Sequence, residues 1–150
     1  MTSIHHQLRH LALLAALCGF LVACSENPDE TRLLQRLDAL ETALQEKQAD
    51  SALDLLTDRF STGRGETRDD IRRLLLLHFF RNRNIGVVRS QTEVTLDEAD
   101  SGQASIRFHA LVTGGEGLLP DRGRQFRVES HWLFEEGDWY LDRLEWQPLL

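Results

Sequence analysis

The chain has 150 residues, of which 24 are acidic and 17 are lysine or arginine, so its formal net charge is −7 at neutral pH. Because the basic residues form no run, the sequence shows no basic segment that would bind the phosphates of a nucleic acid. A hydrophobic content of 41% is ordinary for a globular protein. The chain is also long enough to bury a core of its own, which predicts a single acidic domain.

Residues 1–23 have the features of a signal peptide. A single formal charge, at Arg9, precedes an apolar run over residues 11–22, which suits a signal-peptide core and is too short to span a bilayer. The run leads into Leu21, Val22, Ala23 and Cys24. These four residues resemble the bacterial lipobox, and the resemblance implies cleavage before Cys24 and a diacylglycerol on its thiol.

Ordinary signal cleavage, which would leave a free cysteine near the new N-terminus, is the alternative at this site. Lipidation is favoured because Leu21 fits poorly into a small-x-small cleavage site. Ser25 follows the cysteine in place of the Asp associated with inner-membrane retention, so we expect a lipid-anchored protein of the cell envelope, at the outer membrane and facing the periplasm. Cys18 leaves with the signal peptide, which excludes thiol catalysis and cysteine-based metal binding in the mature domain.

Residues 24–27 form a short tether, and the domain is expected to span residues 28–150. Asn27, Pro28 and Glu30 fit the N-cap, first and third positions of a helix. An apolar stripe at spacings of four, three and four follows, formed by Leu33, Leu37, Leu40 and Leu44. This helix packs either on its own sheet, which is the favoured interpretation, or on a partner helix.

Two further helices are expected before the strands. A short one begins at Ser51 as N-cap, and its buried side is predicted to be Leu53, Leu55, Leu56 and Phe60. The next begins with a capping pattern at Thr67 to Asp70 and is apolar on most sides through Phe80, which predicts a helix wedged in the core. His78 lies in this helix, and a rim-facing histidine is favoured over a ligand or base because no second His or Cys stands one turn away.

From Val87 the hydrophobic period changes to two, which predicts antiparallel strands with one face in the core. The inner rows are read as Val88, Ser90, Thr92, Val94 and Leu96; as Ala104, Ile106, Phe108, Ala110 and Val112; and as Phe126, Val128, Ser130, Trp132 and Phe134. In the last strand the apolar phase changes between Leu141 and Leu144, which indicates a bulge near Asp142 and Arg143. The fold class is therefore α+β, with N-terminal helices on a curved four-stranded meander.

Three helices followed by such a meander, the segment 137–141 (Gly-Asp-Trp-Tyr-Leu), and Trp132 seven residues before Trp139 resemble the nuclear transport factor 2-like superfamily. The resemblance implies a cystatin-like cone, a curved sheet closed by helices. That superfamily includes a steroid isomerase, a dehydratase, polyketide cyclases, transport adaptors and secreted accessory domains. The fold therefore leaves the activity open.

The expected pocket inside this cone lacks acid-base groups on its first three strands. Its predicted lining is His78, Ser90, Thr92, Phe108, Ser130 and Trp132. Apolar walls with a few hydroxyls suit a hydrophobic small molecule, whereas acid-base chemistry needs a carboxylate, His or Tyr at the substrate. The sequence therefore favours a non-catalytic binding or accessory module without cofactor, metal or catalytic residues; a small-molecule isomerase or lyase using the pocket is the alternative.

Three surface features leave alternatives open. Leu118 and Leu119, in the loop between the second and third strands, either cover the open end of the cone or contact an envelope protein. His109 and His131 face outward and would be neighbours in one register, although a metal site would want a third ligand. The outer sheet face suits either a homodimer or open solvent.

Overall fold

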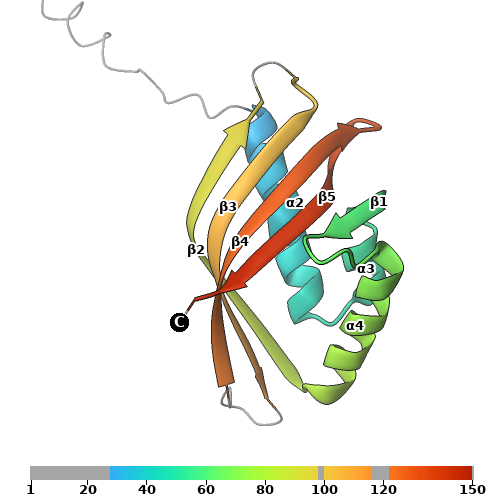
Figure 1. Ribbon diagram of the computed structural model, residues 1–150, viewed down its shortest axis with the longest axis vertical. Coiled ribbons are helices and arrows are strands. Elements are labelled where there is room, and N and C mark those ends of the chain that lie inside the picture. Colours follow the sequence, from blue (N-terminus) through green and yellow to red (C-terminus); the bar gives the residue numbers. More distant parts are fainter. Residues whose placement is uncertain (1–27, 98–99, 116–121, 150) are drawn as a thin grey trace, which may run out of the picture.

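The computed structural model describes residues 28–97, 100–115 and 122–149 (Figure 1). In chain order the elements are α2 (Pro28–Gln45), α3 (Ala49–Leu53), β1 (Leu56–Thr62), α4 (Arg68–Arg81), β2 (Asn84–Leu96), β3 (Gln103–Gly115), β4 (Arg122–Glu135) and β5 (Asp138–Pro148). They form one sheet in the order β1-β5-β4-β3-β2 with helices on its concave side. The predicted α+β architecture is confirmed.

The four predicted strands form an antiparallel meander. β2 pairs with β3, β3 with β4, and β4 with β5. A two-residue turn joins β4 to β5, where Glu136 has φ 52° and Gly137 has φ 87°. Two positive φ angles are what a type I′ hairpin turn requires, which explains the glycine. The sheet curves around α2, whose Leu33 and Leu37 are buried against it.

A fifth strand, β1, corrects the prediction of a second helix extending towards Phe60. The helix α3 ends at Leu53, and its N-cap is Gln48, without a side-chain cap from Ser51. From Leu56 the chain runs parallel to β5 and pairs with it. Leu53, Leu55, Leu56 and Phe60 are buried as predicted. The apolar spacing alone did not separate strand from helix, and pairing with β5 decides the conformation.

The predicted bulge in β5 is confirmed, and it holds β1 in place. His131 pairs with Arg143 and Trp132 with Leu141, so Asp142 is the extra residue. Its carboxylate accepts a hydrogen bond of 2.8 Å from the Thr57 hydroxyl and one of 3.1 Å from Arg59 Nε, both in β1. Trp139 and Trp146 are an odd number of positions apart, which would put them on opposite faces of a regular strand. The extra residue of the bulge restores both to the inner face of the sheet.

A second bulge, in β2, was not predicted. Ser90 pairs with His109 and Glu93 with Arg107, and Gln91 in the extra position has φ 53°. The bulge inverts the inner and outer faces of the strand before it. Val94 and Leu96 face the core as predicted, but Val88 is exposed and Arg89 faces inward in its place.

The capping box of α4 is confirmed, but its burial is not. Thr67 accepts a hydrogen bond from the Asp70 backbone, and the Asp70 carboxylate accepts one from the Thr67 backbone. Only Phe79 is buried in this helix, whereas Leu76 is 54% and Phe80 91% exposed. The helix packs on α3 and β1 and faces the sheet across a cavity, so it is not wedged in the core.

The hydrophobic core comes from all layers of the domain. Its buried residues run from Leu33 in α2 to Leu141 in β5, with Ile106 and Trp132 in the centre of the sheet. Because this core lies within the described residues, we expect residues 25–150 to fold without the segment before them. No helix in the described part of the chain is both long and apolar enough to span a membrane.

Candidate functional site: the cone pocket

A cavity of about 1230 Å³ lies between the sheet and the helices. Its floor is formed by Phe108, Val128 and Trp132 on the concave face of the sheet. Its sides come from the C-terminal half of α2, the inner face of α4 and the ends of β3 and β5. The volume is above the usual range for small-molecule sites, so the cavity has room for a ligand of considerable size.

The opening of the cavity is formed by the solvent-exposed residues of its lining. These residues belong to the turn after β1, to α4, to the ends of β3 and β5 and to the start of β4. The start of α2 lies at the end of the domain where Arg36 forms an ion pair of 3.4 Å with Asp138 in the first position of β5. The start of α2 and the part of the opening formed by β3 and β4 are therefore at opposite ends of the domain (Figure 1).

Four of the six predicted lining residues lie in the cavity wall: His78, Phe108, Ser130 and Trp132. Ser90 and Thr92 do not. Both are exposed, because the bulge at Gln91 turns Ser90 to the outer face beside His109. The processing residues Leu21, Val22 and Ala23, the lipidation residue Cys24, and the loop residues Leu118 and Leu119 lie outside the described residues.

Ser130 is the polar residue at the cavity floor, and the protein itself engages its hydroxyl. Ser130 Oγ accepts a hydrogen bond of 3.0 Å from Trp132 Nε1 and donates one of 3.1 Å to the Ile106 carbonyl. An indole N–H in a core needs an acceptor, and the serine supplies it. The hydroxyl fixes the tryptophan ring and has no proton left for a reaction.

A charge cluster beside the pocket was missed by the sequence analysis. Arg89 reaches from β2 to α2, where it binds Asp38 and lies 3.3 Å, measured at Nε, from Glu41 Oε1. The side chains of Arg89 and Glu41 are only 18% and 17% exposed. The 3.3 Å contact lacks hydrogen-bond geometry, so Glu41 Oε1 is buried without a hydrogen-bond partner among the described residues. Arg89 Nη1 is also buried and has no such partner either.

Glu41 also lines the cavity, and it is the carboxyl group that α2 contributes to this wall. Burial raises the pKa of Glu41 above 4.5; the Arg89 guanidinium opposes the shift and Asp38 adds to it. A carboxyl with a raised pKa next to a pocket is a candidate acid-base group. Its spacing could have revealed it, since Glu41 stands four residues after Leu37 and three before Leu44 in the buried stripe of α2.

The outer face of the sheet holds further ionisable groups. Arg143 and Glu145 form an exposed ion pair of 2.7 Å there, and neither lines the pocket. His109 pairs with Arg127, whereas His131 pairs with Ser105, so the two histidines are not neighbours. Within the described ranges, no group of three or more His, Cys, Asp or Glu side chains is placed to hold a metal ion.

Neither a protein-family model nor a curated protein matches the chain. Solved structures do match its fold. A proposed dehydratase of the nuclear transport factor 2-like family from Streptomyces avermitilis superposes with a TM-score of 0.70 at 13% identity, over 81% of this chain and 97% of that one. A protein of unknown function with a cystatin-like fold from Nostoc punctiforme gives a TM-score of 0.65 at 12% identity, over 83% and 93%.

A third structure, the hexachlorocyclohexane dehydrochlorinase LinA-type3 from Novosphingobium barchaimii, gives a TM-score of 0.65 at 9% identity, over 81% of this chain and 86% of that one. The three neighbours differ in their described functions, and their identities are low. The comparison therefore gives the architecture and no activity. The chain has the nuclear transport factor 2-like, cystatin-like fold, as the sequence resemblance implied.

Proposed function

We propose that this protein is a lipid-anchored lipoprotein of the cell envelope whose cone pocket binds an apolar small molecule without transforming it. The observation that carries the binding function is the cavity of about 1230 Å³ with walls of leucine, phenylalanine and tryptophan. Exposure of so much apolar surface to water is unfavourable in free energy, which favours a ligand that covers it. Apolar walls with few polar groups are also typical of ligand sites. The absence of transformation is supported by the engagement of Ser130 with Trp132.

The anchor is proposed from the lipobox-like sequence before Cys24, and the outer membrane from Ser25 after it. Only residues 25–27 separate the cysteine from the start of α2, a span of roughly 14 Å at full extension. The part of the pocket opening formed by β3 and β4 lies at the end of the domain away from the start of α2. This arrangement favours ligand exchange with the periplasm or with a partner over direct exchange with the anchoring membrane.

Metabolic labelling tests the anchor. Cells that produce the wild-type protein with labelled palmitate should incorporate label, and a Cys24→Ala variant should incorporate none, because the thiol that carries the lipid is gone. A Cys18→Ala variant is the matched control and should label like the wild type, because the signal peptide is removed. Equal labelling of wild type and Cys24→Ala, or label in neither, would refute the anchor.

The pocket is tested with the neutral apolar fluorophore N-phenyl-1-naphthylamine on residues 25–150. We expect saturable binding that an Ala110→Phe variant weakens at least about tenfold, because the larger side chain fills the cavity. Ser105→Phe on the outer face of the same strand is the matched control and should bind as the wild type does. Absence of saturable binding to the wild-type domain would refute the proposed function.

A lyase or isomerase is the second candidate, and one observation favours it: Glu41 lines the cavity and burial raises its pKa. Against it stands the contact of the same carboxyl with Arg89, which offsets its negative charge. Mass spectrometry and NMR spectra of a bound compound before and after incubation separate the two functions. An unchanged mass together with an unchanged spectrum agrees with binding alone, whereas loss of water or of an acid, or conversion to an isomer of the same mass, abolished in Glu41→Gln, would assign an enzyme.

A further inference from the structure

The opening of the cavity carries three arginines that we call the arginine rim: Arg64, Arg81 and Arg124. Within the described part of the chain, none of the three forms an ion pair with a carboxylate. Several other arginines form ion pairs with carboxylates, among them those of the Arg59–Asp142 and Arg68–Asp58 ion pairs.

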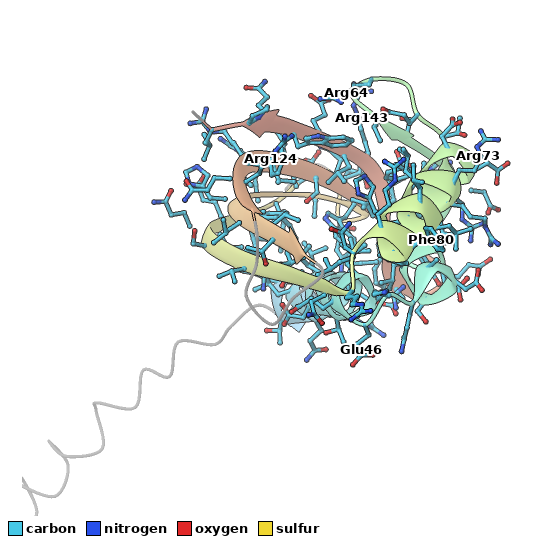
Figure 2. The ribbon with its side chains drawn as sticks, turned by 90° about the horizontal axis from the view of Figure 1, so that it is seen from below. Glu46, Arg64, Arg73, Phe80, Arg124 and Arg143 are labelled. Atoms are coloured by element: carbon cyan, nitrogen blue, oxygen red, sulfur yellow. The ribbon has the colours of Figure 1, made fainter. Side chains whose placement is uncertain are left out.

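The rim comes from three different elements that meet only around the cavity. Arg64 lies in the turn after β1, Arg81 at the end of α4 and Arg124 near the start of β4; Figure 2 views the domain from this side and labels Arg64 and Arg124. Arg64 lies over the ring of Trp146 in the cavity wall, 5.2 Å from its centroid. That contact directs one guanidinium towards the opening without neutralising it.

The carboxylates of the cavity wall do not cancel this charge. Glu41 is held at the α2 side by Arg89. Glu66 is the carboxylate in the wall beside Arg64, and it accepts a hydrogen bond from the Thr62 hydroxyl. Among the described residues, three guanidinium groups against this one carboxylate give the opening an excess of positive charge, while the floor beneath it is apolar.

We infer that the pocket takes a single-chain anionic amphiphile, with its hydrocarbon chain on the apolar floor and its carboxylate or phosphate head group on the arginine rim. The inference deepens the proposed binding function and rests on it. Burial of a hydrocarbon chain contributes about 0.8 kcal/mol per CH₂ group, which drives binding. Guanidinium groups bind carboxylates and phosphates in a bidentate manner, which selects the sign and shape of the head group.

Competition against N-phenyl-1-naphthylamine tests the head group on residues 25–150. Dodecanoate and monododecyl phosphate should displace the fluorophore at concentrations at least about tenfold lower than dodecanol, and dodecyltrimethylammonium should be weaker than dodecanol. The advantage of the anions should shrink at 0.5 M salt because exposed charges are screened. The ratio of dodecanoate to monododecyl phosphate shows which of the two head groups the rim prefers.

Neutral variants of the rim complete the test. Arg64→Gln, Arg81→Gln and Arg124→Gln should each weaken dodecanoate roughly three- to tenfold and leave dodecanol unchanged. Arg107→Gln and Arg127→Gln are matched controls, because both arginines are exposed on the outer sheet face and should have no effect. Retained thermal unfolding temperatures would show that every variant is folded.

Two results would overturn the inference. Equal binding of dodecanol and dodecanoate would mean that the arginine rim does not distinguish an anionic head group from a neutral one. An apolar ligand would still bind in that case, so the proposed function would stand. Equal losses in the rim variants and in the outer-face controls would mean that net charge, not the rim, governs the affinity. If the neutral fluorophore itself fails to bind, the proposed function and the inference fall together.

Discussion

Replacement of Phe60 with alanine should lower the free energy of unfolding by about 3 to 5 kcal/mol. Phe60 lies in β1, is 3% exposed and packs in the main core cluster. It does not line the cone pocket, so its removal leaves a new void with no route for solvent to fill it. Urea unfolding of residues 25–150, followed by tryptophan fluorescence, measures the change.

Phe80→Ala is the matched control, because it removes the same atoms from a side chain that is 91% exposed at the end of α4. We expect a change within about 0.5 kcal/mol. Similar losses at Phe60 and Phe80 would contradict the structure of this half of the domain. They would mean that β1 does not complete the core, or that α4 buries its outer face.

The sequence predicted the part of the fold in which local pattern and tertiary environment agree. In β3 and β4 the alternation of apolar and polar residues runs without interruption, and the predicted inner residues Ile106, Val128 and Trp132 are buried. The change of phase in β5 located the bulge at Asp142, because apolar residues on both sides of it face the same core. Where one face of a strand is buried along its whole length, apolar residues recur with a constant period in the sequence.

Elements that depend on distant partners were not predictable in the same way. β1 has the apolar spacing of a short helix, and its identity as a strand comes from pairing with β5, about 80 residues further along the chain. α4 has the composition of a buried helix, yet its Leu76 and Phe80 are exposed and neither lines the cavity. Which side of an apolar helix is covered depends on its neighbours in the fold, which the hydrophobic pattern does not record.

The candidate site shows the same division. Phe108, Ser130 and Trp132 were predicted in the wall, because they lie in the regular part of the sheet. Val88 and Ser90 were assigned to the wrong face, since a bulge of one residue shifts the phase of the strand before it. The arginine rim could not be predicted, because its members come from a turn, a helix end and a strand start that only the complete fold brings together.

Arg89→Leu should be the most damaging substitution near the pocket, at about 2 to 4 kcal/mol. It leaves Glu41 largely buried without its cation, and the desolvation cost of that carboxylate is then uncompensated. Arg143→Leu removes an arginine from the exposed pair with Glu145 and should cost about 1 kcal/mol or less. The double variant Arg89→Leu with Glu41→Leu should recover most of the loss, because no charge remains buried.

The cost of Arg89→Leu should also depend on pH in a defined direction. Burial raises the pKa of Glu41 above 4.5 while Arg89 opposes the shift, so loss of Arg89 raises that pKa further. The contribution of Glu41 to stability is fully present below 4.5, where the carboxyl is protonated in both folded and unfolded chains, and is lost as pH rises through the folded pKa. Urea unfolding of Arg89→Leu should therefore approach wild-type stability near pH 4 and fall furthest below it at pH 7.5. A difference that stays constant between these pH values would show that Arg89 stabilises the domain by packing and not by its charge.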